Sequence, residues 1–388
     1  MQAQLGDRSL FPDLQARAYL AHGGISPLSR PVADALRAGL AMAEGGGLLA
    51  FPHFLEQADV ARDGFARLIG ADPQEVARVS STSAGVAAIA SAIPLGAGDR
   101  IVVFEGEFPT NVTPWQVAAR ARGAQVVFVP LAPFHRSHDE GLAALDAELE
   151  RGCALVAVSA VQFQTGLAMP LAEIARRAHA VGARVFVDGI QAVGATPLDV
   201  RATEVDYLAC GAHKWLMGPM GAGFLYVAQR ARAELQPLSV GWVSHVDFDR
   251  FLFGPNELRY DRPLSMDATV FEQGVHNFLG LCGLAVSIEL LAGLGSAAIW
   301  SHVQTYFDRV EPPLMERGWR SLRHGEAAGR STICAFAPPA GVDTQAVVAS
   351  LGEAGVVVTG PDGYLRLAPH WPNHVDEVDA IAQALERT

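Results

Sequence analysis

The sequence predicts an α/β protein with a mostly parallel central sheet, followed by a smaller α+β part at its C-terminal end. Runs of β-branched residues, such as residues 100–104 and 184–188, alternate with segments of helical periodicity. A strand that has no polar face is buried on both sides, which is typical of a parallel sheet covered by helices. The chain has 388 residues, 50% of them hydrophobic, and can therefore bury one large core or two moderate ones.

The elements of the first part follow in a regular order. A short strand near residue 18 runs into a Gly-Gly-Ile-Ser-Pro turn at 23–27. Pro31 begins a helix that stops at the glycines 45–47, and a second helix is broken by the Gly-Ala-Asp-Pro sequence at 70–73. Helices are expected at 31–43, 54–68, 113–121, 142–151 and 171–180, and strands at 100–104, 125–131, 154–159, 184–188, 207–210 and 223–227.

The C-terminal part has a different organisation. Residues 240–275 are irregular and rich in aromatic residues, proline and arginine, as in a long loop that crosses a subunit interface. A long apolar helix at 277–294 is expected to form the hinge into a small domain. We predict an N-terminal segment of residues 1–30 that packs with the small domain, a large domain of residues 31–284 and a small domain of residues 285–388. In the small domain, helices are expected at 296–316, 344–353 and from 375, and strands at 331–336, 356–358 and 364–367.

Composition excludes several classes of function. The net charge of −12 and the pI near 5.4 argue against a surface for nucleic acid or anionic membranes. The N-terminal residues lack an apolar signal core, and no stretch approaches the roughly 18 consecutive apolar residues of a membrane span. The sequence has four cysteines, Cys153, Cys210, Cys282 and Cys334. Because they have neither CxxC nor metal-ligand spacing, they indicate free thiols in a reducing cytoplasm and no metal site.

Lys214 is the only lysine in the sequence, and the other basic side chains are arginines. Arginine can replace lysine as a surface cation, but its guanidinium stays protonated and cannot serve as an amine nucleophile. The surviving lysine is therefore a candidate for a role that needs its nitrogen. Compositional drift with one lysine left by chance is the alternative, and the count alone does not separate the two.

Three sequence features near this lysine could belong to one site. Asp188 ends a predicted buried strand, where open α/β sheets place their ligands, and Gln191 follows in the next turn. The alternative for Asp188 is a helix N-cap. His213 precedes the lysine and could equally be a satisfied core histidine. The hydroxyl-rich sequence at 79–86 precedes an alanine-rich helix and suits an anion, although an ordinary Ser/Thr N-cap is the commoner use of such residues.

Together these features describe the needs of pyridoxal 5'-phosphate. This cofactor requires an amine for a Schiff base, a carboxylate that keeps its ring nitrogen protonated, and a cradle for its phosphate. The order of phosphate loop, aspartate and lysine along alternating strands agrees with such a site. The sequence has neither a Walker lysine nor a GxGxxG motif between a strand and a helix, so an NAD-dependent oxidoreductase is disfavoured.

The sequence also resembles a known family over nearly its whole length. Val-Asp-Gly-Ile-Gln-Ala at 187–192 and Ala-His-Lys-Trp-Leu-Met-Gly-Pro at 212–219 are similar to motifs of class V aminotransferase-fold enzymes. This fold type I group includes cysteine desulfurases, selenocysteine lyases and isopenicillin N epimerase-like proteins. The resemblance implies that Lys214 forms the Schiff base, Asp188 faces the pyridine nitrogen, Gln191 contacts the phenolic oxygen, and His213, Thr82 and Ser83 bind the phosphate.

Further site residues follow from the same resemblance. Phe108 stands where many desulfurases have a histidine on the cofactor ring, so stacking is kept and acid–base chemistry of that residue is lost. Gln162 corresponds to a polar contact with the cofactor. Arg366 corresponds to the arginine that binds the substrate carboxylate, and a solvated strand arginine is its alternative. His22 belongs to the N-terminal turn that lines the substrate site. Residues 271–277 match a segment that reaches the neighbouring subunit's phosphate, with valine at 275 in place of the usual threonine.

The sequence departs from the desulfurase pattern at one place. Desulfurases carry a persulfide-forming cysteine just before the carboxylate arginine, and residues 356–364 contain none. Cys334 lies in a predicted core strand, where an inert thiol is the usual case. We therefore expect a homodimeric pyridoxal-phosphate enzyme that acts on a small amino acid as a lyase or epimerase, with transamination as the alternative. The alternative from another functional class is a binding or scaffold protein that no longer uses the cofactor. The site of such a protein would be expected to have lost Lys214 or Asp188.

Overall fold

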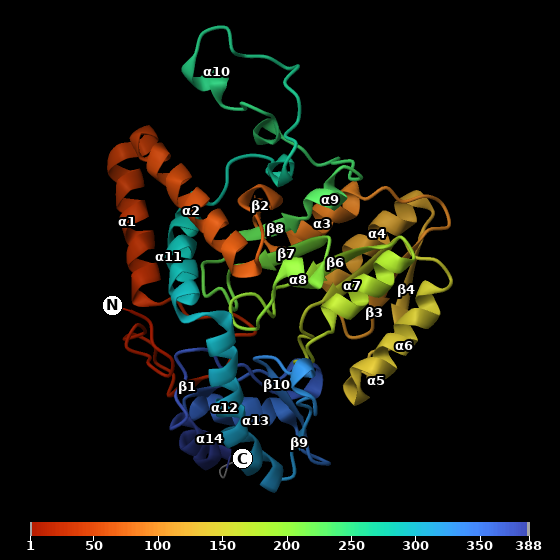
Figure 1. Cartoon of the computed structure of the whole chain (residues 1–388). Coiled ribbons are helices and arrows are strands. Elements are labelled where there is room, and N and C mark those ends of the chain that lie inside the picture. The colour runs from red at the N-terminus through yellow and green to blue at the C-terminus, as the bar shows by residue number, and fades with distance from the viewer. Residues whose placement is uncertain (1, 386–388) are drawn as a thin grey trace.

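The computed structural model describes residues 2–385, and its larger part is built on a seven-stranded sheet (Figure 1). The strand order is β2-β8-β7-β6-β5-β3-β4, with β8 antiparallel to both of its neighbours and the other pairs parallel. The mostly parallel sheet predicted from the sequence is thus confirmed. The strands are β2 (Val76–Val79), β3 (Arg100–Phe104), β4 (Gln125–Val129), β5 (Leu155–Ser159), β6 (Arg184–Asp188), β7 (Tyr207–Gly211) and β8 (Gly223–Val227).

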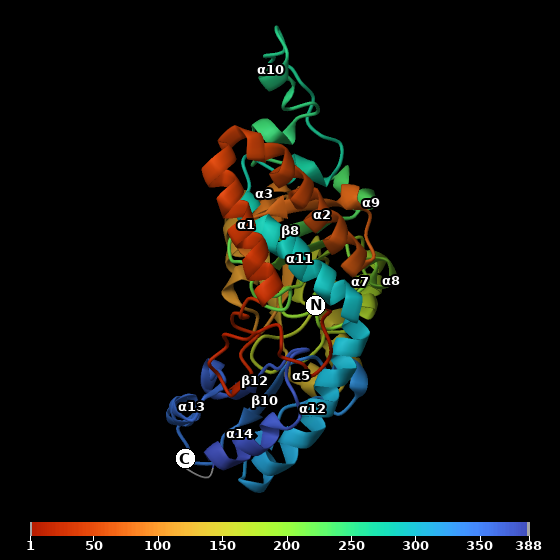
Figure 2. The same cartoon turned by 90° about the vertical axis from the view of Figure 1, so that its left-hand side faces the viewer.

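Helices bury this sheet, which explains why its central strands have no polar face. Every residue of β5, β7 and β8 is buried. Three helices, α1 (Arg30–Gly46), α2 (Phe51–Ile69) and α11 (Phe278–Leu294), lie side by side at the β2 edge of the sheet (Figures 1 and 2). Two of them, α2 and α11, approach closely because Gly64 has no side chain: a Cβ there would come within 2.6 Å of Ile288. The helices of this part are α1 (Arg30–Gly46), α2 (Phe51–Ile69), α3 (Thr82–Ala92), α4 (Thr113–Arg122), α5 (Ala132–Arg136), α6 (His138–Leu149), α7 (Leu171–Ala180), α8 (Val200–Thr203), α9 (Gln229–Arg232) and α11 (Phe278–Leu294).

The C-terminal part is a smaller α+β unit with a core of its own. Its sheet has the antiparallel order β12-β10-β9, and a separate two-stranded pair joins β1 to β11 in parallel. The N-terminal strand β1 therefore lies against this part of the molecule (Figure 1). Its elements are β1 (Ala18–Tyr19), α12 (Ser296–Glu316), β9 (Arg320–Ser321), β10 (Cys334–Ala337), α13 (Thr344–Glu353), β11 (Val356–Val357), β12 (Leu365–Leu367) and α14 (Glu377–Leu385).

The chain passes from one part to the other through a sharp bend between α11 and α12. The two helix axes differ in direction by 74°, and Gly295 between them has a φ of +79°. This bend lies inside the range 285–388 that the sequence assigns to the small domain, so the exact domain division stays a prediction. Within residues 2–385 no single helix is long and apolar enough to cross a membrane, although this bent pair reaches the required length together.

Some elements differ from those predicted. Strand β2 was not expected, because it has only four residues and directly precedes the hydroxyl-rich sequence. Helix α6 begins at residue 138, before the predicted 142, because Ser137 caps it by accepting a hydrogen bond from the Glu140 backbone N–H at 3.2 Å. Strand β10 is shorter than predicted. Its Cys334 is buried, and burial raises the pKa of that thiol, as expected for an inert cysteine.

An irregular arm, residues 236–266, projects from the large part (Figures 1 and 2). It corresponds to the predicted long loop and contains a 3₁₀ turn (Trp242–Ser244) and one helical turn, α10 (Arg250–Phe253). Large apolar side chains are exposed on it, including Phe253 (76%), Tyr260 (91%) and Met266 (81%). An apolar surface of this kind is typical of a segment that packs against another protein chain.

Candidate active site

The carboxyl ends of three neighbouring strands bring the predicted site residues together. Asp188 is the last residue of β6, and it pairs in register with Ser159 of β5 and Ala209 of β7. Lys214 lies in the turn that follows β7. The topology therefore explains why an aspartate and a lysine that are distant in the sequence lie at one edge of the sheet.

The Lys214 amine is mostly buried. Its Nζ atom lies 5.7 Å from the centroid of the Phe108 ring, and no residue within 2–385 forms a hydrogen bond or ion pair with it. Burial lowers the pKa of Lys214 to about 8, with the nearby Asp188 opposing this shift. The lysine backbone is anchored, because the Ser26 hydroxyl donates to the Lys214 carbonyl at 2.6 Å. A desolvated amine on a fixed backbone is suited to act as a nucleophile and a base.

Asp188 is a buried carboxylate with spare hydrogen-bonding capacity. Its Oδ1 accepts a hydrogen bond from the Ile190 backbone N–H at 3.0 Å, and within the described residues Oδ2 has no partner. Burial raises the pKa of Asp188 to about 6, and the Ile190 bond and the Lys214 charge partly offset this effect. The residues that directly follow Asp188 form a turn and not a helix, so the alternative of a helix N-cap does not apply. The free oxygen can accept a hydrogen bond from a donor such as a protonated ring nitrogen.

The start of α3 lies beside the turn that carries the lysine. Ser81 is the N-cap, and its hydroxyl accepts from the Ala84 N–H at 3.1 Å. Thr82 and Ser83 are therefore free of the capping role. Thr82 Oγ1 accepts from the Gly211 N–H at 2.9 Å, and Ser83 shares a hydrogen bond with Thr110 at 2.8 Å. These hydroxyls lie at a helix N-terminus, where backbone N–H groups and the helix dipole favour an anion.

His213 lies on the same side of the site. A Cβ at Gly211 would come within 3.2 Å of Thr82 Oγ1 and 3.4 Å of His213 Nδ1, so both side chains approach the same glycine. Burial, together with the Lys214 charge, lowers the pKa of His213, and the ring is neutral near pH 7. A neutral imidazole can donate one hydrogen bond to a phosphate oxygen.

Two glutamine side chains are held by the protein in defined orientations. Gln191 donates through Nε2 to the Gly23 carbonyl at 3.0 Å and accepts from Trp215 Nε1 at 2.8 Å. Gln162 donates through Nε2 to Glu107 at 3.1 Å. Each amide retains one N–H that makes no bond with residues 2–385 and could reach a cofactor oxygen.

Arg366 carries a buried guanidinium. Its Nε donates to the Thr359 hydroxyl at 3.0 Å, and Nη1 donates to the Phe163 carbonyl at 2.6 Å. Its exposed fraction is 5%, and no acidic side chain within residues 2–385 forms an ion pair with it. Burial lowers the pKa of Arg366 to about 10, so the group remains charged. A buried, unpaired cation is costly, and a bound carboxylate would compensate it. The alternative of a solvated strand arginine does not apply.

The N-terminal turn closes this side of the site. A Cβ at Gly23 would lie 3.5 Å from the Arg366 Cζ and 3.4 Å from the Gln191 amide oxygen, so the turn lies close beside the arginine. His22 Nδ1 lies 2.8 Å from Ser26 Oγ. Because the Ser26 proton is donated to the Lys214 carbonyl, the His22 ring must donate to Ser26 and is protonated at Nδ1. The N-terminal segment thus connects the arginine side and the lysine side.

Sequence reasoning missed two residues that organise this site. Glu107 accepts hydrogen bonds from several of its neighbours, and Phe163 packs its ring edge-on against Phe108 at 5.2 Å while its carbonyl receives Arg366. Each is the chain neighbour of a predicted site residue: Glu107 directly precedes Phe108, and Phe163 directly follows Gln162. The spacing of Glu107, Asn111 and Trp115 at four-residue intervals is the one sequence signal that could have indicated a hydrogen-bonded string.

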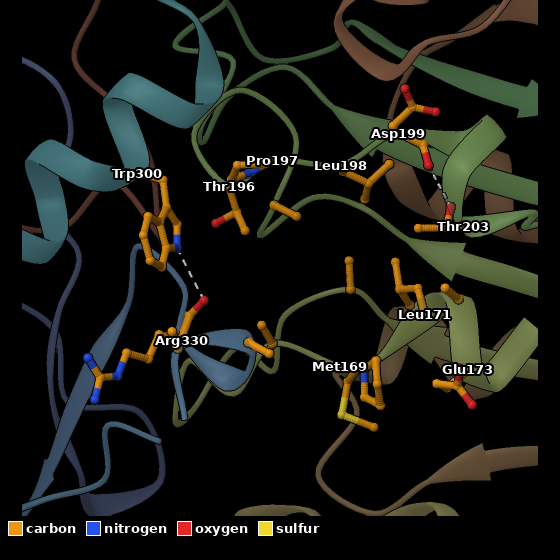
Figure 3. A pocket seen from close by; sticks show the side chains of 17 residues that line it. Met169, Leu171, Glu173, Thr196, Pro197, Leu198, Asp199, Thr203, Trp300 and Arg330 are labelled. Carbon is orange, nitrogen blue, oxygen red and sulfur yellow. Dashed lines mark hydrogen bonds between the residues drawn. The ribbon is translucent and has the colours of Figure 1, made fainter. Parts of the chain in front are cut away.

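A separate pocket of about 480 Å³ lies between the two parts of the molecule and is distinct from these residues (Figure 3). Its wall is mostly apolar and includes Met169, Leu171, Pro197, Leu198 and Trp300. None of the residues predicted for the active site lines it. The arrangement of charged and polar groups around Lys214, and not the size of a pocket, therefore identifies the candidate site. Within residues 2–385 there is no cluster of metal-ligating side chains.

Comparisons with known proteins agree with this geometry. Residues 36–364 match the aminotransferase class-V family. Isopenicillin N epimerase of Amycolatopsis lactamdurans is 30% identical over 383 residues, which cover 94% of this chain and 93% of the relative. The uncharacterized aminotransferase YcbU of Bacillus subtilis is 27% identical over 383 residues, covering 97% and 96% of the two chains.

A solved structure of the cysteine desulfurase CsdA from Escherichia coli has the same fold. It matches with a TM-score of 0.85 and 25% sequence identity, over 98% of this chain and 96% of that one. Because the family match extends over most of the sequence, the protein belongs to the class-V aminotransferase family and is an enzyme that uses pyridoxal 5'-phosphate.

Proposed function

We propose that this enzyme acts at the α-carbon of a small amino acid, by a lyase or epimerase-like reaction. One observation carries the proposal: Arg366 and Lys214 lie at the same site, and among residues 2–385 the buried guanidinium has no carboxylate and the buried amine has no hydrogen-bond or ion-pair partner. An α-amino acid supplies the carboxylate for the first and the amino group that reacts near the second. The likeness to an isopenicillin N epimerase over nearly the whole chain supports the choice of reaction.

The side chains present fit pyridoxal 5'-phosphate. Asp188 has a free carboxylate oxygen for the ring nitrogen, and the half-exposed Phe108 ring, 46% accessible, offers a stacking face. Gln162 and Gln191 would contact the ring substituents through their remaining N–H groups. Thr82, Ser83 and His213 would hold the phosphate at the start of α3. When bound, the cofactor supplies an electron sink for negative charge that develops at the substrate α-carbon.

The remaining chemistry belongs to the side chains of this chain. Lys214 is the covalent attachment point, and its amine, with a pKa lowered to about 8, can take a proton from the α-carbon and return it. Arg366 retains N–H groups on both terminal nitrogens and would bind the carboxylate in a fork, which fixes the orientation of the α-carbon bonds. His22 and Gly23 would line the substrate side. The orientation that Arg366 gives to the α-carbon bonds would decide which of them reacts.

Two related reactions can be compared with this proposal. Transamination needs the same residues, and the likeness to an uncharacterized aminotransferase keeps it as the second candidate. A desulfurase that forms a protein persulfide is disfavoured, because the loop before Arg366 contains no cysteine. This loop is held in place: Thr344 donates to the Gly363 carbonyl at 2.7 Å, and Gln164 donates to Asp362 at 2.8 Å.

We also propose that the enzyme is a homodimer. The projecting arm exposes large apolar side chains, and Val275, which is 76% exposed, borders two cavities of about 370 and 160 Å³ beside the start of α3. A second copy packed on the arm would cover these surfaces. Residues 274–277 of each copy would then approach the phosphate site of the other copy. The four free cysteines support a reducing compartment such as the cytoplasm.

The proposed cofactor site can be tested with the purified wild-type protein. We expect it to be yellow or to become so with added pyridoxal 5'-phosphate, with borohydride reduction fixing the cofactor covalently to residue 214. Peptide mass spectrometry after reduction locates the modification, and incubation with single amino acids then screens for racemisation, elimination and keto-acid release. A protein that binds no cofactor would support the scaffold alternative and contradict the proposal.

A further inference from the structure

We propose that Glu107, which the reaction described above does not use, is a positioning residue of the cofactor site. This inference rests on the proposed function, because it concerns how the site is held ready for the cofactor. Glu107 is buried, with an exposed fraction of 9%, and it directly precedes Phe108, the expected stacking residue. A buried carboxylate is costly unless it is well satisfied, so its position indicates a specific role.

The Glu107 carboxylate receives four hydrogen bonds. Oε1 accepts from the Ser159 backbone N–H at 2.7 Å and from Gln162 Nε2 at 3.1 Å. Oε2 accepts from the Ser159 hydroxyl and from Asn111 Nδ2 at 3.0 Å. Each oxygen therefore has two donors, and one of the four donors, Gln162, is a residue expected to contact the cofactor.

These donors require a carboxylate and not merely a polar side chain. Asn111 cannot turn its amide around, because its Oδ1 accepts from Trp115 Nε1 at 3.1 Å, so it must present Nδ2 to Glu107. The Ser159 backbone N–H is also a fixed donor. A glutamine at 107 would place its own N–H₂ group against one of these donors, and only a side chain with two acceptor oxygens satisfies both. The carboxylate thereby also determines which end of the Gln162 amide faces the site.

The same carboxylate connects three walls of the site. Ser159 is the register partner of Asp188 on the neighbouring strand, and Gln162 lies in the loop after β5. Phe108 is joined to Glu107 by the chain itself. Ionised Glu107 thus fixes the backbone at Ser159, the amide of Gln162 and the start of the loop that carries the Phe108 ring. Its protonation would release part of this arrangement.

Protonation of Glu107 occurs in an accessible range. Burial and the nearby Asp188 raise the pKa of Glu107, to about 7, against the lowering effect of its donors. The carboxylate is ionised above this pH and protonated below it. Other titratable or charged groups around the site are Asp188, Lys214, His213, Cys210 and Arg366. A variant at position 107 keeps all of these groups. Their effects on cofactor binding therefore largely cancel when the dissociation constant of the variant is divided by that of the wild type.

The test measures the dissociation constant of pyridoxal 5'-phosphate across pH for Glu107→Gln, with Glu105→Gln as the matched control. Glu105 is an exposed glutamate two residues earlier in the chain. We expect the Kd of Glu107→Gln to exceed that of wild type about tenfold at pH 8.5 and only about twofold at pH 6, where wild-type Glu107 is itself neutral. The Glu105→Gln ratio should stay near one throughout.

The possible outcomes separate the two proposals. If the wild-type protein binds no cofactor, the proposed function fails. If wild type binds but the Glu107→Gln ratio is near one, or is raised equally at every pH, the positioning role is wrong. Should Glu107→Gln not fold, Ser159→Ala decides the matter, because it removes one hydroxyl donor and leaves the predicted site residues in place. It should raise the Kd about threefold at pH 8.5, and an unchanged Kd would overturn the inference.

Discussion

Replacing Lys214 by alanine is expected to abolish turnover while leaving the fold intact. The substitution removes the covalent attachment point and the proposed base, and loss of a general base alone reduces kcat by about 10²–10⁴-fold. The free energy of unfolding should not fall, because the buried amine has no partner among the described residues and its desolvation opposes folding. Steady-state kinetics and urea unfolding of the same preparation measure the two effects.

Lys214→Arg is the matched variant for this prediction. It keeps a positive charge and a long side chain, but a guanidinium cannot attach the cofactor or act as a base near neutral pH. Both variants should therefore be inactive, and borohydride should fix no cofactor in either. Appreciable turnover by Lys214→Arg would show that only the charge matters and would contradict the proposed mechanism.

Replacing Arg366 by lysine is expected to have the second largest effect. Complete removal of one partner of a buried, hydrogen-bonded charge pair costs about 2–5 kcal/mol, or roughly 30- to 5000-fold in kcat/KM, so the loss for a lysine that keeps the charge should lie near the lower end of this range. Lysine retains the charge but loses the fork that can bind a carboxylate while contacting Thr359 and Phe163. The kinetics of wild type and variant on the same amino acid measure the loss.

A substrate analogue provides the control for Arg366. The primary amide of the amino acid lacks the negative charge that the arginine is proposed to bind. Wild type and Arg366→Lys should process this amide with similar kcat/KM, because the wild type gains little from its guanidinium there. An equal loss for acid and amide would mean that Arg366 supports the structure of the site and does not recognise the carboxylate.

Much of the fold could be predicted because its signals are local. Buried strands of the parallel sheet are short β-branched runs, and α7, α12 and α13 begin and end at the predicted residues. Strand β2 could not be found in this way. It is stabilised by the pairing with β8 and by Arg78, whose guanidinium forms an ion pair at 2.8 Å with Glu272, far away in the sequence.

Residues of the candidate site could be proposed from the sequence where chemistry restricts the residue type. A single lysine and an aspartate at a strand end stand out without a structure, and the family resemblance supplied Arg366. The burial of Arg366 without a carboxylate could not be read from the sequence, because it depends on how the N-terminal turn and β12 meet. The role inferred for Glu107 depends likewise on donors that three separate segments contribute.

The position of the single lysine has a further consequence for protease experiments. An endopeptidase specific for lysine has one cleavage site in this chain, between Lys214 and the fully buried Trp215. Surface loops, including the exposed arm, contain no such site and cannot be cut. The cleavage rate therefore reports how often the centre of the large part opens, and when reclosing is fast it measures the equilibrium population of that open form. Cleavage at the residue proposed to carry the chemistry therefore measures the local stability of the candidate site itself.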